Sequence, residues 1–166
     1  MNKGQSLFEV IFALSIAAVI LTSVVSLATI SIKNSDYSAN KTMATKYAQE
    51  AIEWLRGQRD AKWSDPTNNG FLERAAANNG TYCLDSLGWT NTGNCASDEF
   101  ISVNDLYLRQ VVLTCYQINA SPPPDFNAVA CGSTTDNIQA EVSVSWTDGS
   151  GTHSVQSTAR FTHWNY

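Results

Sequence analysis

The sequence predicts an α+β fold in which one long amino-terminal helix packs on a carboxy-terminal antiparallel β-sheet. Three observations support this expectation. No glycine or proline occurs between Gln5 and Arg56, so nothing interrupts a helix there. The first part of that stretch, Val10 to Ile32, is 23 residues without a charge. Near the carboxyl end, residues 138–147 alternate apolar and polar side chains, which is the pattern of a half-buried strand.

The charge-free run is long enough to cross a lipid bilayer. At about 1.5 Å per residue it reaches roughly 35 Å, against a hydrocarbon core of about 30 Å. A secretory signal has an apolar core of only about 7–15 residues. We therefore expect a leader over residues 1–4, a transmembrane helix over 5–32, and contact with inner-membrane lipid. The basic Lys3 favours a cytoplasmic amino terminus, with the bulk of the chain outside.

Glu9 is the one charge at the start of this apolar segment. A charge deep in a membrane segment costs at least about 2.5–3.5 kcal/mol on insertion scales. Near the end of the span, Glu9 can be a tolerated acid that reaches the lipid headgroups. The functional alternative is a positively charged partner that neutralises Glu9 when subunits meet. The residue alone does not choose between these two readings.

The helix is predicted to continue over residues 33–60 as an amphipathic segment. Apolar side chains recur at spacings of three and four from Met43 to Leu55, which predicts one apolar stripe. Gly57 is a candidate end of the helix, and Pro66 must lie beyond it. The stripe needs a folded domain to cover it, and residues 61–166 are expected to supply that extracytoplasmic α+β head.

The first part of the head, to about residue 104, is predicted to be rich in loops. The segment 71–77 is a candidate short helix, and residues 65–70 form a turn cluster. Asp65, Asn68 and Asn69 raise the possibility of a calcium loop. Their spacing does not match an EF-hand, so turn chemistry is preferred and no metal site is expected.

The last part of the chain is predicted to form at least three antiparallel strands. The first covers Leu106–Ile118 and is followed by an extended loop at Ser121–Phe126, which is rich in proline. The strand at residues 138–147 then returns through a turn at Asp148–Gly151 into a last strand over residues 152–164. A sheet that is apolar on one face is the partner that the helix stripe requires.

Four cysteines, Cys83, Cys95, Cys115 and Cys131, lie beyond the membrane segment. An even count in a small exported domain favours disulfides, and three pairings are possible. We favour Cys83–Cys95 with Cys115–Cys131, because each pair closes a short loop. The CxxC pairs typical of zinc sites are absent from the sequence.

The sequence carries no recognisable catalytic motif, and no enzyme activity or cofactor is expected. It has no glycine-rich phosphate loop, HExxH or GxSxG pattern. Asp148, Ser150 and His153 are neighbours in sequence, but a hairpin tip is open to water. The chain carries 10 basic and 15 acidic residues, which argues against nucleic acid as a partner.

The amino-terminal string GQSLFEVIFALSIAAVIL, Gly4 to Leu21, resembles the class III signal of type IV pilins and type II secretion pseudopilins. The resemblance covers about the first 60 residues. It implies cleavage after Gly4 by prepilin peptidase, methylation of the new amino terminus at Gln5, and pairing of Glu9 with a neighbouring subunit's terminal amine. The family usually begins its mature chain with phenylalanine, so glutamine at this position suggests a minor subunit.

The resemblance therefore implies a pilin-like fold and a non-enzymatic structural subunit, a minor pilin or pseudopilin. Its expected partners are other pilin or pseudopilin subunits, prepilin peptidase and the membrane assembly platform. The precursor would cross the cytoplasmic membrane once, and the assembled subunit would lie in a pilus or pseudopilus. The alternative is a single-pass anchor for an extracytoplasmic binding or adhesion domain that does not assemble.

Overall fold

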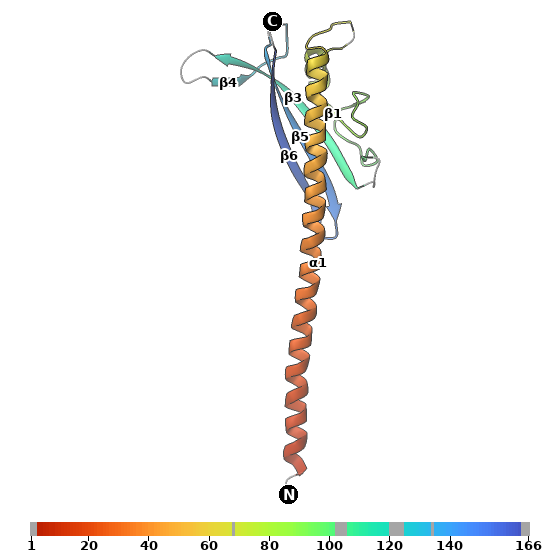
Figure 1. Cartoon of the computed structure of the whole chain (residues 1–166), viewed down its shortest axis with the longest axis vertical. Coiled ribbons are helices and arrows are strands. Elements are labelled where there is room, and N and C mark those ends of the chain that lie inside the picture. Colours follow the sequence, from red (N-terminus) through yellow and green to blue (C-terminus); the bar gives the residue numbers. More distant parts are fainter. Residues whose placement is uncertain (1–2, 68, 102–105, 120–124, 134, 164–166) are drawn as a thin grey trace. The chain divides into compact units, whose positions relative to one another are not determined.

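The computed structural model describes residues 3–67, 69–101, 106–119, 125–133 and 135–163 (Figure 1). The chain divides into two compact units, Met1–Asn40 and Lys41–Tyr166, and the second is called the head unit below. The elements in chain order are α1 (Lys3–Ala61), α2 (Phe71–Ala76), the 3₁₀ helix η1 (Ala77–Gly80), β1 (Thr81–Cys83), β2 (Asn91–Thr92), β3 (Tyr107–Asn119), β4 (Asp125–Ala128), β5 (Asn137–Asp148) and β6 (Gly151–Thr162).

The long amino-terminal helix is confirmed as α1, which contributes to both units. Between Leu7 and Ala61 it is long and apolar enough to cross a membrane, which is compatible with a single-pass anchor. The helix passes through Gly57, which is therefore not its end, and stops at Ala61, one residue beyond the predicted segment 33–60. Tertiary contacts outweigh the helix penalty of glycine, since Gln58 accepts a hydrogen bond from Trp89 Nε1 and Arg59 lies over the Phe161 ring.

The head unit contains one antiparallel sheet with strand order β2-β1-β3-β5-β6, and β4 pairs with β3. The three predicted strands are present as β3, β5 and β6. Tyr107 lies opposite Trp146 in the β3–β5 pair, and Asp148 lies opposite Gly151 at the β5–β6 turn. The alternation along β5 is complete, with every second side chain from Ile138 to Trp146 buried.

One face of this sheet packs against the part of α1 that belongs to the head unit. The helix contributes three fully buried alanines, Ala44, Ala48 and Ala51, which allow the backbones to approach closely, together with Ile52 and Leu55. The sheet contributes Tyr107, Val111, Leu113, Cys115, Ile138, Ala140, Val142, Val144, Trp146 and Phe161. The predicted packing of helix on sheet is therefore confirmed, and burial of these apolar side chains is its main driving force.

Three short strands were not predicted. β1 and β2 lie in the segment expected to be loops, and β4 begins at Asp125, inside the expected loop at Ser121–Phe126. Residues 121–124 of that loop lie outside the described residues. The backbone of β4 pairs with the end of β3, and the Cys115–Cys131 disulfide ties the chain that follows β4 to β3.

The predicted short helix is present as α2 and leads through η1 to Gly80. Gly80 has φ +67°, and a Cβ atom there would lie 2.0 Å from the Leu113 carbonyl oxygen. Only glycine allows this close approach of the loop to β3. This contact positions β1 for its pairing with β3.

Candidate functional site

The sequence-predicted processing site lies in the first turns of α1. Met1 and Asn2, half of the expected leader, lie outside the described residues. Gly4 and Gln5 belong to the helix that begins at Lys3. The backbone of α1 is therefore continuous from these two residues to Glu9.

Glu9 lies about one turn beyond Gln5 along α1, with an exposed side chain. A shallow depression on the helix surface is lined by Glu9 together with Phe8, Phe12, Ala13 and Ile16. The carboxylate is thus surrounded by apolar side chains on its own helix. Among the side chains that the structure describes, no ion pair involves Glu9.

Within the first unit, the segment Leu7–Ile32 presents large apolar side chains along its whole length. The large apolar side chains from Leu7 to Ile32 are 51% to 76% exposed. An apolar surface of this extent is not stable in water, because monomeric proteins rarely expose contiguous patches above a few hundred Å². This surface is compatible with lipid or other helices as its surroundings.

Four hydroxyl groups within the apolar segment bond to the helix itself. Ser15 donates to the Ile11 carbonyl oxygen at 2.8 Å, and Thr29 donates to that of Val25 at 2.9 Å. Thr22 and Ser23 make the same type of bond one turn back, to Ala18 and Val19. These bonds satisfy the hydroxyl groups without water, which suits a lipid environment.

The head unit contains a buried cation that the sequence analysis missed. Arg109 on β3 is 2% exposed, and its Nη1 atom lies 2.7 Å from Glu50 Oε2 on α1. Its Nε atom donates to the Leu84 carbonyl oxygen at 2.8 Å, and Nη1 also donates to that of Tyr47 at 3.2 Å. One side chain therefore joins α1, β3 and the chain after β1.

A signal for Arg109 was present in the sequence. It occupies an inward position in the alternation of β3, between Tyr107 and Val111. A charge at such a position needs a specific partner. The partner, Glu50, is 59 residues away, so the spacing in sequence could not identify it.

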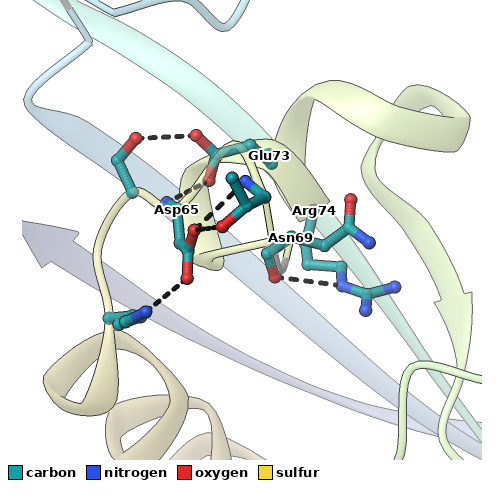
Figure 2. A network of polar contacts seen from close by, with 7 residues as sticks. Asp65, Asn69, Glu73 and Arg74 are labelled. Atoms are coloured by element: carbon teal, nitrogen blue, oxygen red, sulfur yellow. Dashed lines mark hydrogen bonds and ion pairs between the residues drawn. The ribbon is translucent and has the colours of Figure 1, made fainter.

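The loop after α1 is held by two carboxylates, as Figure 2 shows. Asp65 Oδ1 accepts hydrogen bonds from the backbone and hydroxyl of Thr67, and Oδ2 pairs with Lys62. Glu73 on α2 accepts from the Ser64 hydroxyl at 2.6 Å and from the Asp65 N–H at 3.0 Å. This is turn chemistry, as expected. Of the other residues in the calcium alternative, Asn68 lies outside the described residues, and the Asn69 carbonyl oxygen accepts from Arg74.

The pKa of Glu73 reflects this arrangement. Burial alone would raise it, but the hydrogen bonds from Ser64 and Asp65 outweigh burial and lower the pKa below 4.5. The ionised carboxylate is therefore the form that holds the loop.

The four cysteines form two disulfides, Cys83–Cys95 and Cys115–Cys131, which is the pairing that we favoured from the sequence. Glu99 lies close to the first pair, within 4.8 Å of both sulfur atoms. Since these sulfur atoms are bonded to each other, they are not thiolate ligands for a metal. The disulfides tie the loop after β1 and the chain after β4 to the sheet.

The hairpin tip between β5 and β6 brings Asp148, Ser150 and His153 together without forming a triad. Asp148 Oδ1 accepts from the Ser150 backbone N–H at 2.7 Å and lies 3.2 Å from His153 Nε2. The Ser150 N–H first, and His153 second, lower the pKa of Asp148. The histidine ring also packs on Trp146, with centroids 5.3 Å apart. These contacts are those of a turn.

An open depression of about 580 Å³ lies at the carboxyl end of α1. It is bordered by Arg59, Asp60 and Lys62, with Trp63 and His163 stacked at 5.3 Å. Its charged side chains already pair with each other or with the neighbouring loop, as Arg59 does with Asp60 at 2.7 Å. His163 thus has a packing role here.

No family model, no curated protein and no solved structure matches this chain.

Proposed function

We propose that this chain is a non-enzymatic structural subunit of a type IV pilus-like filament, a minor pilin or pseudopilin. In this proposal it enters the cytoplasmic membrane as a precursor and is cut after Gly4 by prepilin peptidase. The new amino terminus at Gln5 is methylated. The assembly platform then brings α1 into a bundle with the helices of other pilin or pseudopilin subunits.

The observation that carries the proposal is the combination of an apolar helix surface with one acid at its start. The exposed side chains from Leu7 to Ile32 suit lipid before assembly and neighbouring helices after it. Glu9 adds nothing to a simple anchor, because an apolar residue would insert at lower cost. A role in assembly gives this position a reason to be acidic.

Cleavage and assembly are linked by charge in this proposal. The positive amine at Gln5 exists only after Met1–Gly4 has been removed. Two unit charges about 4 Å apart attract by about 4 kcal/mol at an effective dielectric constant of about 20. This exceeds the insertion cost of about 2.5–3.5 kcal/mol for an acid in a membrane helix. An amine from a neighbouring subunit can therefore offset the cost of Glu9 and set the register between helices.

The attraction is needed because apolar helices gain no hydrophobic energy from meeting in lipid. Packing and a specific polar pair must supply the preference. Ala13, Ala17, Ala18 and Ala28 offer small surfaces where helices approach closely. The head unit remains outside the membrane, where oxidising conditions maintain its two disulfides.

The test replaces Glu9 with glutamine in a cell that assembles the wild-type chain into filaments. Glu9→Gln removes the charge but keeps a similar shape, so we expect normal cleavage and loss of the chain from sheared filaments. Ser15→Ala is the matched control, because it removes a polar group from the same helix without changing charge. If the Glu9→Gln chain is found in filaments at the wild-type level, Glu9 does not have the proposed role in assembly.

The same experiment separates the proposal from its alternative. A single-pass anchor for a binding or adhesion domain would stay in the membrane fraction with its leader attached. It would be absent from filaments even as the wild-type chain. Gly4→Leu adds a second check, since this variant should retain the leader and the extra mass of Met1–Gly4.

A further inference from the structure

Strand β6 is an edge of the sheet, and within the described part of the chain no second strand pairs with its outer side. It ends the strand order β2-β1-β3-β5-β6, and among the described elements only β5 pairs with it. Figure 1 shows β6 at the side of the sheet away from β1. Its alternate residues from Thr152 to Thr162 are all exposed.

The register identifies which backbone groups point outward. In the two-residue hairpin, Asp148 and Gly151 are a hydrogen-bonded pair, and such pairs recur at every second residue. The same alternation is seen beyond the strand, where His163 N donates to the Asp136 carbonyl oxygen at 2.9 Å. The odd-numbered residues of β6 therefore bond to β5. The outward residues are Thr152, Ser154, Gln156, Thr158, Arg160 and Thr162.

This edge carries only one of the devices that usually prevent strand pairing, the charged side chain of Arg160. Natural edge strands carry proline, lysine or a bulge, or are very short. β6 has 12 residues, no proline and no lysine, and it pairs with β5 in 12 consecutive registers without a bulge. By contrast, β2 at the opposite edge has two residues and β4 has four.

We propose that β6 binds the β6 strand of a second copy of this chain, antiparallel and centred on Ser157. Only an extended backbone presents N–H and C=O groups at the spacing that an open edge requires. In this register Thr152 faces Thr162, Ser154 faces Arg160, and Gln156 faces Thr158. It is the one antiparallel register in which all six outward residues pair with outward residues of the partner.

The side chains are compatible with this self-pairing. Arg160 is the only lysine, arginine or acid in β6, and its partner Ser154 is small and uncharged. No like charges face each other directly, and such pairs would be destabilising. In this register the edge therefore pairs with itself without direct charge repulsion.

The pairing fixes the relative orientation of the two head units that it joins. The two-fold axis that relates antiparallel strands also reverses the α1 segment 41–61, which runs along the sheet (Figure 1). In the pair, the two head units therefore point in opposite directions along the strand axis. The pairing itself does not depend on the proposed function.

The test is disulfide formation in the full chain, purified in detergent. All four native cysteines are already paired, so an engineered cysteine is the only free thiol. Ser157 would face itself in a non-hydrogen-bonded pair, with Cα atoms about 4.5 Å apart, which suits a disulfide. Ser154→Cys is the matched control, because its partner position is Arg160. We expect Ser157→Cys to form a covalent dimer at least about tenfold faster than Ser154→Cys.

A second variant tests whether the backbone carries the contact. The Thr158 N–H points outward, so Thr158→Pro removes a donor from the interface and none from the β5–β6 pair. Placed in the Ser157→Cys chain, it should abolish the fast cross-link, whereas Thr158→Val should keep it. Unfolding followed by tryptophan fluorescence checks that both variants are folded.

Equal cross-linking rates for Ser157→Cys and Ser154→Cys would overturn the proposal, whatever the behaviour of the proline variant. A folded Thr158→Pro chain that still cross-links rapidly would exclude pairing through the backbone.

Discussion

Replacing Glu50 with glutamine tests the buried ion pair of the head unit. Glu50 and Glu53 lie one turn apart on α1, and each has an arginine partner at a similar distance. Glu50 lies 2.7 Å from Arg109, and Glu53 lies 2.9 Å from Arg56. The partners differ in burial, because the side chain of Arg109 is 2% exposed and that of Arg56 is 53% exposed.

The magnitude follows from this difference. Removing one partner of a fully buried pair costs about 3–5 kcal/mol, and a hydrogen bond to a charged group contributes about 1.5–3 kcal/mol. Glu50 is itself 53% exposed, so water partly replaces it, and glutamine keeps a neutral acceptor. We therefore expect Glu50→Gln to lower the free energy of unfolding by about 2 kcal/mol. Glu53→Gln should change it by less than about 0.5 kcal/mol, as for a surface pair.

The assay is urea unfolding of the full chain in detergent with its disulfides intact. The signal is fluorescence from the tryptophans of the head unit, including Trp54, Trp89 and Trp146. With a slope of about 2 kcal/mol per molar urea, Glu50→Gln should shift the midpoint by about 1 M. Equal shifts for Glu50→Gln and Glu53→Gln would refute the reasoning, because burial of Arg109 would then contribute nothing.

The remaining predictions concern local backbone, charge and cross-links of the same unit. Gly57→Ala should raise the free energy of unfolding by about 0.5–1 kcal/mol, because Gly57 is inside α1 and its added Cβ meets nothing within 4 Å. Gly80→Ala should lower the free energy of unfolding by about 3 kcal/mol, because alanine is strained at this left-handed backbone position and its Cβ clashes with β3. Urea unfolding measures the change for Gly57→Ala and for Gly80→Ala. Equal changes in the two variants would be inconsistent with the described loop at Gly80. The lowered pKa of Glu73 stabilises the fold above about pH 4.5, and this contribution disappears as the pH falls through the folded-state pKa. Between about pH 5 and pH 3 the wild-type chain should therefore lose more stability than Glu73→Gln, and parallel pH profiles would exclude this role. Replacing Cys115 and Cys131 together by serine should lower the midpoint by an amount equivalent to about 3 kcal/mol, since the disulfide closes a loop of separation 16.

The main elements could be predicted because each has a local pattern in the sequence. β5 alternates buried and half-buried residues because one face of the sheet covers α1. The α1 stripe repeats with helical spacing for the same reason, and the absence of glycine and proline up to Arg56 indicated one continuous helix. Burial on one side of a regular element leaves a periodic signal that a single sequence can reveal.

The missed features depend on contacts distant in sequence. β1 has three residues and is a strand because Tyr82 pairs with Val111, and three residues are too few for a periodic pattern. Gly57 was a candidate helix end because glycine is a weak helix former, whereas Gln58 and Arg59 make tertiary contacts that carry the helix past it. Propensity describes local preference, and packing overrides it.

The candidate sites also divide into features that the sequence could predict and features that depend on contacts distant in sequence. The cysteine pairing could be favoured from loop length, because both disulfides join residues near in sequence. Arg109 could be marked as an unusual inward charge, but its partner Glu50 becomes apparent only once α1 and β3 are side by side. The expected functions of Gly4, Gln5 and Glu9 involve other molecules, so they remain predictions.

The most direct test of the proposed function is the intact mass of the chain from membranes that contain an active prepilin peptidase. We expect the mass of a chain that begins at Gln5, with the added mass of a methyl group on its amino terminus. Gly4→Leu in the same membranes should give the mass of the full precursor. A wild-type chain that retains Met1–Gly4 beside an active peptidase would contradict the account.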